Sequence, residues 1–344
     1  MIDKEMLAYD DVLLQPQFSN IRSRREIDIS VKLKKDITLS LPIISSPMDT
    51  ITGGTMAATM SKSGGIGIVH RYNTIEKQVL EIVRAYECAP DDNIIVGAAV
   101  GVTGDYLERA QALVSAGVDI LCIDVAHGHH LLTKEALQDI KALAPDVHIM
   151  AGNVATLEGI NDLADWGADS VRCNIGGGSI CSTRIQTGHG MPGLQTIFDC
   201  AKTDRDVAII ADGGIRNSGD IVKALAAGAD AVMCGSLLSG TTETPGSIFE
   251  DRDGFKYKTY RGMASKEAQI KWRGKYSSFE GVASQVPFRG SVEPLLEDLK
   301  RGINSGFSYS GARTLSELQS TAVFVRQTSA GFGESKTHIN TRKW

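Results

Sequence analysis

The sequence of 344 residues predicts an α/β fold, a (β/α)8 TIM barrel with a flap over the C-terminal face of its strands. One observation is a repeated segment, in which a glycine, a small or apolar residue, an aspartate and a short mostly apolar run follow one another. A second is that each copy follows a stretch with the hydrophobic spacing of a helix. The copies occupy residues 117–124, 167–174 and 228–235, and the stretches before them occupy 106–115, 160–166 and 221–227.

The repeated segment predicts a helix end followed by a buried strand. Its glycine can adopt the left-handed conformation that commonly ends a helix. Apolar runs buried on both faces are typical of parallel sheets that helices cover. Further strands are predicted at 42–46, 65–69, 94–100, 148–151 and 207–211. About eight such units favour a TIM barrel over the alternative, an open doubly wound sheet.

A length of 344 residues allows one large barrel or two ordinary domains, and the barrel pattern predicts a single domain over residues 1–344. The net charge of −5 gives no reason to expect nucleic acid or a membrane as partner. We expect a cytoplasmic protein, because the sequence has no signal peptide and no apolar run that would span a bilayer. None of the six cysteines forms a C-x-x-C pair, so no zinc site is expected. Four of the six lie in or beside apolar runs, as reduced core thiols do.

Glycine-rich loops after the predicted strands indicate a phosphate site. The segment Gly176-Gly-Gly-Ser179 exposes successive backbone N–H groups and adds a hydroxyl donor, which suits an anion. By itself it would also fit a flexible turn. Two similar loops follow, Asp212-Gly-Gly214 and Gly235-Ser236, and TIM barrels commonly bind phosphate with the loops after their last two strands. Together the three loops predict a phosphorylated ligand.

Cys181 is the candidate nucleophile. It lies two residues beyond the first of these loops and three before Arg184. Backbone donors and a nearby cation favour the thiolate, which is the nucleophilic form of cysteine. An isolated cysteine would more often be a buried structural thiol, but the position beside a ligand loop favours nucleophilic catalysis.

Other polar side chains at strand ends have two interpretations each. Asp212 can accept two ribose hydroxyls or cap a helix. Asp124 can orient a nicotinamide nucleotide or form a salt bridge within a loop. Arg71 offers a cation for a cofactor phosphate or lies on the surface. The His-Gly-His-His segment at 127–130 has poor spacing for metal ligands, and solvated loop histidines are the favoured interpretation.

Two segments late in the chain lack a clear pattern. Residues 255–287 are polar, and we expect them to pass over the barrel mouth, with the flap at about 264–285. The tail at about 326–344 is expected to be irregular and mobile.

From about Leu7 to His338 the chain resembles the inosine-monophosphate dehydrogenase / guanosine-monophosphate reductase family. The segments that carry the resemblance are Tyr9-Asp-Asp-Val-Leu-Leu14, Met48-Asp-Thr50, Gly64-Gly-Ile-Gly67, Ile123-Asp-Val-Ala-His-Gly128, Ala151-Gly-Asn-Val-Ala-Thr156, Gly178-Ser-Ile-Cys-Ser-Thr-Arg184, Ala211-Asp-Gly-Gly-Ile-Arg216, Ser218-Gly-Asp220 and Tyr260-Arg-Gly-Met263. The resemblance implies that Cys181 adds to C2 of a purine nucleoside monophosphate, with Thr183 assisting the group that leaves or attacks there.

The resemblance also implies the remaining site residues. The substrate would be bound by Ser179, Asp212, Gly214, Gly235, Ser236, Tyr260, Gly262 and Met263, and the cofactor by Asp124, Asn153 and Arg71. In dehydrogenases of the family, the carbonyls matching Gly176, Gly178 and Cys181 can bind a monovalent cation such as potassium. Self-association as a homotetramer is expected on the same grounds.

This chain departs from the family pattern in two places. The usual loop reads Gly-x-Gly-Pro-Gly-Ser, but Asn174 replaces its first glycine and Gly177 replaces its proline. A free glycine makes the loop more flexible, which counts against the cation site. The regulatory insert that most dehydrogenases carry after the second strand is absent, because residue 94 follows closely on the helix predicted at 75–86.

The flap favours a reductase, which converts GMP and NADPH to IMP, ammonia and NADP. A dehydrogenase, which converts IMP, NAD and water to XMP and NADH, needs a long flap with adjacent Arg-Tyr to activate water. Here the only candidates, Arg273 and Tyr276, are not adjacent. In a reductase, Glu280 and Thr183 would form the proton relay for ammonia loss, with Glu280 as general acid/base.

Other observations keep alternatives open. The segments Ala211-Asp-Gly-Gly-Ile-Arg216 and Gly235-Ser236 read more like the dehydrogenase. A catalytically silent nucleotide sensor would not need Cys181, Thr183 and Glu280 together. A flavin-dependent barrel oxidoreductase would also bind phosphate at the last two strands, but its purified protein would be yellow.

Overall fold

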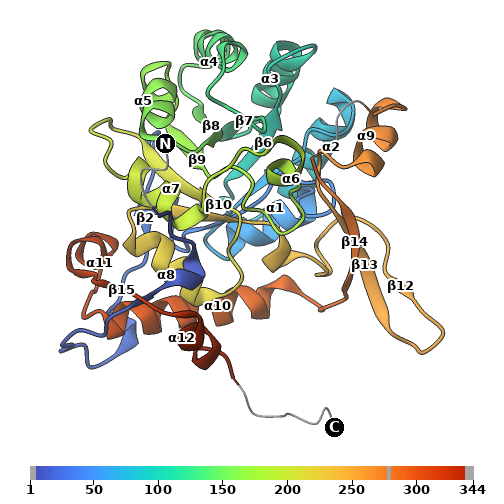
Figure 1. The fold of residues 1–344 in the computed structure, drawn as a ribbon. Coiled ribbons are helices and arrows are strands. Elements are labelled where there is room, and N and C mark those ends of the chain that lie inside the picture. The colour runs from blue at the N-terminus through green and yellow to red at the C-terminus, as the bar shows by residue number, and fades with distance from the viewer. Residues whose placement is uncertain (1–4, 277–279, 338–344) are drawn as a thin grey trace.

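Eight parallel strands close into a barrel in the computed structural model, which describes residues 5–276 and 280–337 (Figure 1). Each strand pairs with its neighbours in the sequence, and the last pairs with the first. This confirms the predicted (β/α)8 barrel and excludes the open doubly wound sheet. The strands are β4 (Ile43–Ser45), β5 (Ile66–Val69), β6 (Val96–Val100), β7 (Ile120–Asp124), β8 (His148–Val154), β9 (Ser170–Cys173), β10 (Ala208–Asp212) and β11 (Ala231–Cys234).

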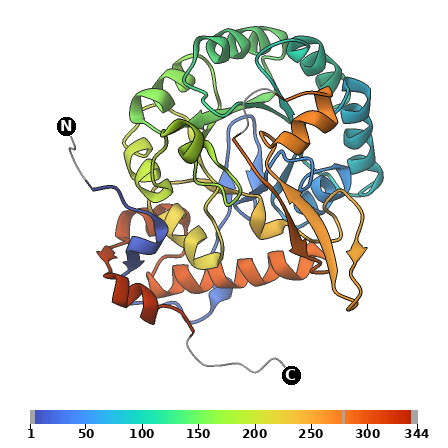
Figure 2. The same ribbon diagram turned by 45° about the vertical axis from the view of Figure 1, so that its right-hand side comes forward.

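Helices cover the outside of the barrel, as the view in Figure 2 shows. Several begin at a capping side chain, because Thr74, Thr156 and Asn217 each accept a backbone N–H from the first turn of the helix that follows. The outer helices are α1 (Gly54–Lys62), α2 (Ile75–Glu87), α3 (Tyr106–Ser115), α4 (Leu131–Leu143), α5 (Leu157–Asp165), α7 (Gly193–Cys200), α8 (Ser218–Ala226) and α10 (Val292–Tyr309). The short helix α6 (Thr183–Thr187) lies at the barrel mouth instead.

The glycines of the repeated segment end helices as predicted. Gly117, Gly167 and Gly228 have φ angles of 90°, 113° and 114°, a region that side chains rarely adopt. At Gly228 the packing also requires glycine, since a Cβ atom there would lie 2.5 Å from that of Ala201. The repeat therefore marks the points where the chain turns from a helix into the next barrel strand.

Alternate residues of each strand face two different hydrophobic cores. In β7, Ile120 and Cys122 point into the barrel interior, whereas Leu121 and Ile123 pack against the helices. Four of the six thiols are buried in these cores, as their apolar surroundings predict: Cys122, Cys173, Cys200 and Cys234. The side chains of the strands therefore fill the barrel, and only its C-terminal end is left for a site.

The chain after residue 323 is more regular than predicted. Strand β15 (Phe324–Arg326) pairs antiparallel with β1 (Val12–Leu14), and α12 (Ser329–Glu334) follows it. The prediction of an irregular tail is therefore wrong as far as Glu334, because pairing with the N-terminal segment orders the chain. Residues 335–337 form no helix or strand, and residues 338–344 lie outside the described residues. Smaller elements are 3-10 turns at Tyr9–Asp11, Arg24–Glu26 and Ser236–Leu238, the pair β2 (Val31–Lys32) and β3 (Thr38–Leu39), and α11 (Leu315–Thr321).

The polar stretch before α10 is also more regular than predicted. Strands β12 (Phe249–Glu250), β13 (Lys256–Arg261) and β14 (Ala283–Pro287) form an antiparallel sheet. Helix α9 (Lys266–Arg273) lies between β13 and β14 in sequence and close to α2 in both views (Figures 1 and 2). The sequence shows no alternation of apolar and polar residues in these strands, because most of their side chains are polar and exposed. Residues 277–279 of the predicted flap lie outside the described residues.

In the described residues, no helix is long and apolar enough to cross a membrane.

His148 makes the stability of the barrel depend on pH. Its buried ring contacts the Ser170 hydroxyl at 2.8 Å and the Lys34 carbonyl at 3.2 Å, and burial lowers the pKa of His148 below 6.5. Below about pH 6.5, His148 binds a proton more readily in the unfolded chain than in the folded protein. The free energy of unfolding therefore falls as the pH falls. We expect this fall, measured by urea unfolding at about pH 7.5 and about pH 5.5, to be smaller in His148→Gln. Equal falls in the two proteins would contradict the assignment.

Candidate active site

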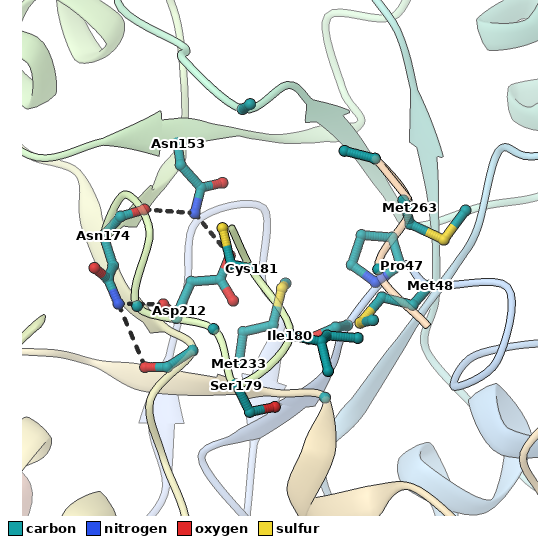
Figure 3. Close-up of a pocket in the computed structure, with 18 of the residues that line it drawn as sticks. Pro47, Met48, Asn153, Asn174, Ser179, Ile180, Cys181, Asp212, Met233 and Met263 are labelled. Carbon is teal, nitrogen blue, oxygen red and sulfur yellow. Dashed lines mark hydrogen bonds between the residues drawn. The ribbon is translucent and has the colours of Figure 1, made fainter. Parts of the chain in front are cut away.

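One cavity of about 290 Å³ at the C-terminal ends of the barrel strands collects every site residue predicted from the sequence. Figure 3 shows part of its lining: Cys181 and Asp212 lie on one side of the view and Met263 lies on the opposite side. The predicted residues that line it are Arg71, Asp124, Asn153, Gly176, Gly178, Ser179, Cys181, Thr183, Asp212, Gly214, Gly235, Ser236, Tyr260, Gly262, Met263 and Glu280.

The predicted phosphate loops converge on one wall of this cavity. A Cβ atom at Gly213 would lie 3.4 Å from the backbone of Gly178, so the two glycine loops pack directly against each other. The Ser179 hydroxyl lies 3.4 Å from the Tyr260 hydroxyl, and Ser236 hydrogen-bonds to the same phenol. Burial raises the pKa of Tyr260, which keeps it a neutral hydrogen-bond donor. The wall therefore presents hydroxyl donors suited to an anion.

A chain of hydrogen bonds runs from Cys181 to a carboxylate. The Cys181 thiol donates to Thr183 Oγ1 at 3.1 Å, and the Thr183 hydroxyl donates to Glu280 Oε2 at 2.7 Å. Backbone contacts hold the two ends together, since the Ser182 N–H donates to the Glu280 carbonyl at 2.9 Å and Cys181 forms a β-bridge with Gly281. The geometry allows a proton to move between the thiol and the carboxylate through one hydroxyl.

Arg172, which the sequence analysis missed, neutralises the two predicted aspartates. Its guanidinium donates to Asp124 Oδ1 at 2.7 Å and to Asp212 Oδ2 at 2.8 Å. Burial opposes the charge of Arg172, but Asp212 and Asp124 hold its pKa well above the ordinary value. A signal was available, because an arginine inside the otherwise apolar run of β9 must find partners when that strand is buried on both faces.

Asn153 ties the same cluster to the adjacent strand. Its side-chain amide donates to Asp212 Oδ2 at 2.8 Å and to the Asn174 carbonyl at 3.0 Å (Figure 3). The Asp212 carboxylate therefore bonds to Asn153 and Arg172 instead of capping a helix, and the Asp124 salt bridge to Arg172 joins two strands instead of lying within one loop. Both carboxylates belong to one network that joins β7, β8, β9 and β10.

A second missed pair holds the opposite wall. The Arg261 guanidinium donates to Asp49 Oδ1 at 3.1 Å and forms an ion pair with the same carboxylate, and both side chains are almost completely buried. The Asp49 N–H also lies 3.1 Å from the sulfur of Met263. The pair therefore fixes the backbone of Gly262 and Met263, which the cavity exposes. Both partners lie in segments that resemble the family, but their pairing required the fold.

Arg71 lies at the rim, but not on the surface. Its side chain is 16% exposed, its guanidinium donates to the Asp124 carbonyl at 3.0 Å, and it covers the rings of Tyr72 and Trp272. Trp272 belongs to α9, and its ring centroid lies 4.4 Å from that of Tyr72. Arg71 thus joins the flap helix to the strand ends.

Two histidines of the segment at 127–130 form contacts with neighbouring helices. His129 Nε2 lies 2.8 Å from Asp162 Oδ2, and His130 accepts the N–H of Leu132 at the start of α4. Within the described ranges, no group of three or more histidine, cysteine or acidic side chains could hold a metal ion. The Gly178 carbonyl, one of those that the resemblance assigns to a monovalent cation, accepts the Cys181 N–H at 3.1 Å.

Tyr276, one of the two flap residues considered for water activation, is not among the described residues that line the cavity. Tyr276 is 46% exposed, and the Lys266 ammonium lies 4.7 Å from the centre of its ring. The Arg273 side chain lies outside what the structure describes.

Removal of Arg172 should strongly destabilise the protein. Arg172→Met keeps a side chain of similar length but removes the buried guanidinium, which leaves Asp124 with only the longer ion pair to Arg71 and takes from the partly buried Asp212 its cationic partner. We expect a loss of about 3–5 kcal/mol in the free energy of unfolding, measured by urea denaturation. Arg205→Met is the control, because it removes an arginine that also bridges two aspartates, Asp165 and Asp204, but on the surface. Similar losses in the two variants would contradict the role of the buried cluster.

Comparisons with known proteins place the chain. The sequence profile of the IMP dehydrogenase / GMP reductase domain matches residues 6–338. The chain is 34% identical to inosine-5′-monophosphate dehydrogenase of Nitrosopumilus maritimus over 97% of this chain and 98% of that protein. It is 32% identical to GMP reductase of Leishmania major over 97% of each.

Solved structures agree with this placement. The crystal structure of a GMP reductase variant from Trypanosoma brucei in complex with guanosine 5′-monophosphate matches with a TM-score of 0.91 and 31% identity, over 98% of this chain and 99% of that one. The comparisons thus include both activities of one family. The chain belongs to the IMP dehydrogenase / GMP reductase family and is an oxidoreductase of purine nucleotide metabolism.

Proposed function

We propose that this enzyme is a GMP reductase, which converts GMP, NADPH and a proton to IMP, ammonia and NADP. The hydrogen-bonded chain of Cys181, Thr183 and Glu280 carries the proposal, because loss of ammonia needs a proton delivered beside the nucleophile. The flap supports it, since the sequence from 264 to 285 contains no adjacent Arg-Tyr pair to activate water.

The loops suggest how GMP binds. Its 5′-phosphate would contact Ser179, Ser236 and Tyr260, with the backbone N–H groups of the glycine loops beside them. Asp212 would accept the ribose hydroxyls, and Arg172 and Asn153 hold that carboxylate in place. The remaining contacts would come from the backbone at Gly214, Gly235, Gly262 and Met263. This arrangement directs C2 of the base toward Cys181.

The residues then divide the reaction into two halves. The Cys181 thiol adds to C2, and its proton passes through Thr183 to Glu280. Glu280 returns the proton to the 2-amino group, ammonia leaves, and a thioimidate remains on Cys181. Hydride addition at C2 then releases IMP, with the C–S bond electrons returning to sulfur. Glu280 therefore acts in the first half only.

The groups around Asp124 fit a nicotinamide cofactor. The side-chain amide oxygen of Asn153 is buried and makes no hydrogen bond within the described residues, so it can accept one from a carboxamide. Asp124 is fixed by Arg172 on one side, and Arg71 adds a positive charge at the rim, which favours the phosphorylated form of the cofactor, NADPH, over NAD. When bound, the cofactor supplies the hydride.

The domain organisation and assembly follow the same proposal. We propose a single catalytic domain without a regulatory insert. In support, only residues 88–95 separate α2 from β6. We further propose a cytoplasmic homotetramer, which rests on the likeness to the family.

An IMP dehydrogenase is the second candidate. The segments Ala211-Asp-Gly-Gly-Ile-Arg216 and Gly235-Ser236 favour it, and dehydrogenases are among the similar proteins. Two assays on the purified enzyme decide between the candidates: oxidation of NADPH with GMP, and reduction of NAD with IMP. Turnover in the first assay alone supports the reductase, and turnover in the second alone overturns it.

Loss of the thiol should abolish turnover but not binding. Cys181→Ala removes the atom that forms the covalent bond, whereas the phosphate and ribose contacts lie elsewhere. We expect kcat to fall by at least about 10³-fold, with GMP affinity measured by calorimetry largely unchanged. Cys88→Ala, which removes an exposed thiol far from the site, should keep full activity. Near-normal turnover by Cys181→Ala would refute the nucleophile.

Loss of the acid/base should stop ammonia release. Glu280→Gln keeps the size of the side chain and its hydrogen bond to Thr183 but cannot carry the proton. Ammonia release from GMP, measured in a coupled assay, should fall by about 10²–10⁴-fold, while GMP binding persists. Glu267→Gln, an exposed position on the flap helix α9, is the matched control. Undiminished ammonia release in Glu280→Gln would show that another group transfers the proton.

A further inference from the structure

We propose that Asn174 is a positioning residue for Cys181. Its side chain packs against Gly177 and forms an interlock, the contact between these two residues. Asn174 and Gly177 stand where the usual family loop has Gly and Pro. The inference concerns the same site as the proposed function and rests on it only for the activity measurement. Asn174 and Gly177 are the two positions where this chain departs from the family pattern. The structure brings those two departures into contact.

The backbone at Asn174 is one that glycine normally occupies. Its φ angle is 145°, in the region that side chains rarely adopt, although a glycine there would be free of strain. Asparagine is also almost completely buried at this position, with 4% of its surface exposed. Since strain is retained where it serves a function, the side chain must supply something that glycine cannot.

The side chain of Asn174 joins the Cys181 loop to the neighbouring strand end. Its amide nitrogen donates to the Asp212 carbonyl at 2.9 Å and lies 3.5 Å from the Gly213 carbonyl (Figure 3). Its backbone carbonyl accepts the Asn153 amide at 3.0 Å. The residue therefore fixes the start of the loop to β8 and β10, which also carry the Asp212 cluster.

The same amide occupies the place of a side chain at residue 177. A Cβ atom on Gly177 would lie 2.1 Å from the Asn174 amide nitrogen and 2.8 Å from Cγ. Neither atom can move away without breaking the bond to Asp212. Proline or alanine at 177 is therefore incompatible with asparagine at 174, and the two departures compensate for each other.

The interlock restores rigidity that three consecutive glycines would otherwise remove. Beyond it, Gly178 packs on Gly213, and the Gly178 carbonyl accepts the Cys181 N–H at 3.1 Å. The turn that presents the thiol is thus built directly on the anchored glycines. Small errors in the position of a nucleophile cost large factors in rate, so the anchor should act on catalysis.

The cost of the arrangement supports a positioning role over a stabilising one. The Asn174 amide oxygen is buried and has no hydrogen-bond partner among the described residues. An unpaired buried acceptor and a strained backbone both reduce stability. A residue present only for stability would incur neither.

A double-mutant cycle tests the interlock. The proteins are the wild type, Asn174→Gly, Gly177→Pro and the double variant, which restores the usual Gly and Pro together. We expect each single change to lower kcat about tenfold with a smaller effect on the KM for GMP, and the double variant to recover to within about threefold of wild type. Gly177→Ala, alone and with Asn174→Gly, repeats the cycle if the proline variant does not fold.

Alkylation of Cys181 by iodoacetamide gives a readout that does not depend on the reaction catalysed. Its rate, followed by mass spectrometry of the Cys181 peptide, should change at least about threefold in each single variant and return in the double variant. Asn174→Asp keeps the shape but cannot donate to Asp212, so it should behave like Asn174→Gly. Thermal unfolding confirms that each protein is folded.

The outcomes separate the inference from the proposed function. If the wild type turns over IMP and NAD instead of GMP and NADPH, the reductase proposal fails. The mutant cycle is then measured with the IMP reaction, and the alkylation experiment is carried out as before. Additive effects of the two single changes, or wild-type kcat and alkylation in Asn174→Gly, would overturn the interlock.

Discussion

The Arg172 guanidinium lies between two carboxylates from different strands, and the rest of the site depends on this buried cluster. In the proposed function, Asp124 and Asp212 accept hydrogen bonds from ligand hydroxyls and amides at the barrel mouth, yet two partly buried carboxylates repel each other and lose part of their hydration. Arg172 satisfies both, at 2.7 and 2.8 Å, from the strand that also leads into the Cys181 loop. One buried charge thus fixes Asp212, Asp124 and the start of the Cys181 loop relative to one another, and these carry the proposed ribose, cofactor and nucleophile roles.

The two walls of the cavity have different kinds of support. The barrel wall is rigid because the glycine loops pack on each other and strand pairing holds their ends. The flap wall is attached by side-chain contacts and by backbone hydrogen bonds to the Cys181 loop. The side-chain contacts are the buried pair of Asp49 and Arg261 and the packing of Trp272 against Tyr72 and Arg71, and the Ser182 N–H donates to the Glu280 carbonyl. Glu280 comes from the flap, whereas its hydrogen-bond partner Thr183 comes from the barrel. The proposed acid/base is therefore in place only when the flap is docked.

The sequence predicted the features that local patterns encode. The repeated glycine marked the helix ends, the apolar runs marked the strands, and polar residues at strand ends marked the site, because parallel strands of a barrel end on one face. Arg172 and the pair of Asp49 and Arg261 were missed, because their partners are 40 to 212 positions away and only the closed fold brings them together. The sheet around β13 and the strand β15 were missed for a related reason: their strands are polar or short, and pairing with distant segments orders them.

In the proposed reaction, C2 of GMP, held on Cys181, receives a hydride after ammonia has left. The most direct test uses NADPH with deuterium at the transferable position of the nicotinamide, with GMP as substrate and proton NMR of the purified product. The account predicts IMP that lacks the C2 proton signal, since deuterium has been delivered there. IMP with ordinary hydrogen at C2, or no IMP at all while the enzyme converts IMP and NAD to XMP, would contradict it.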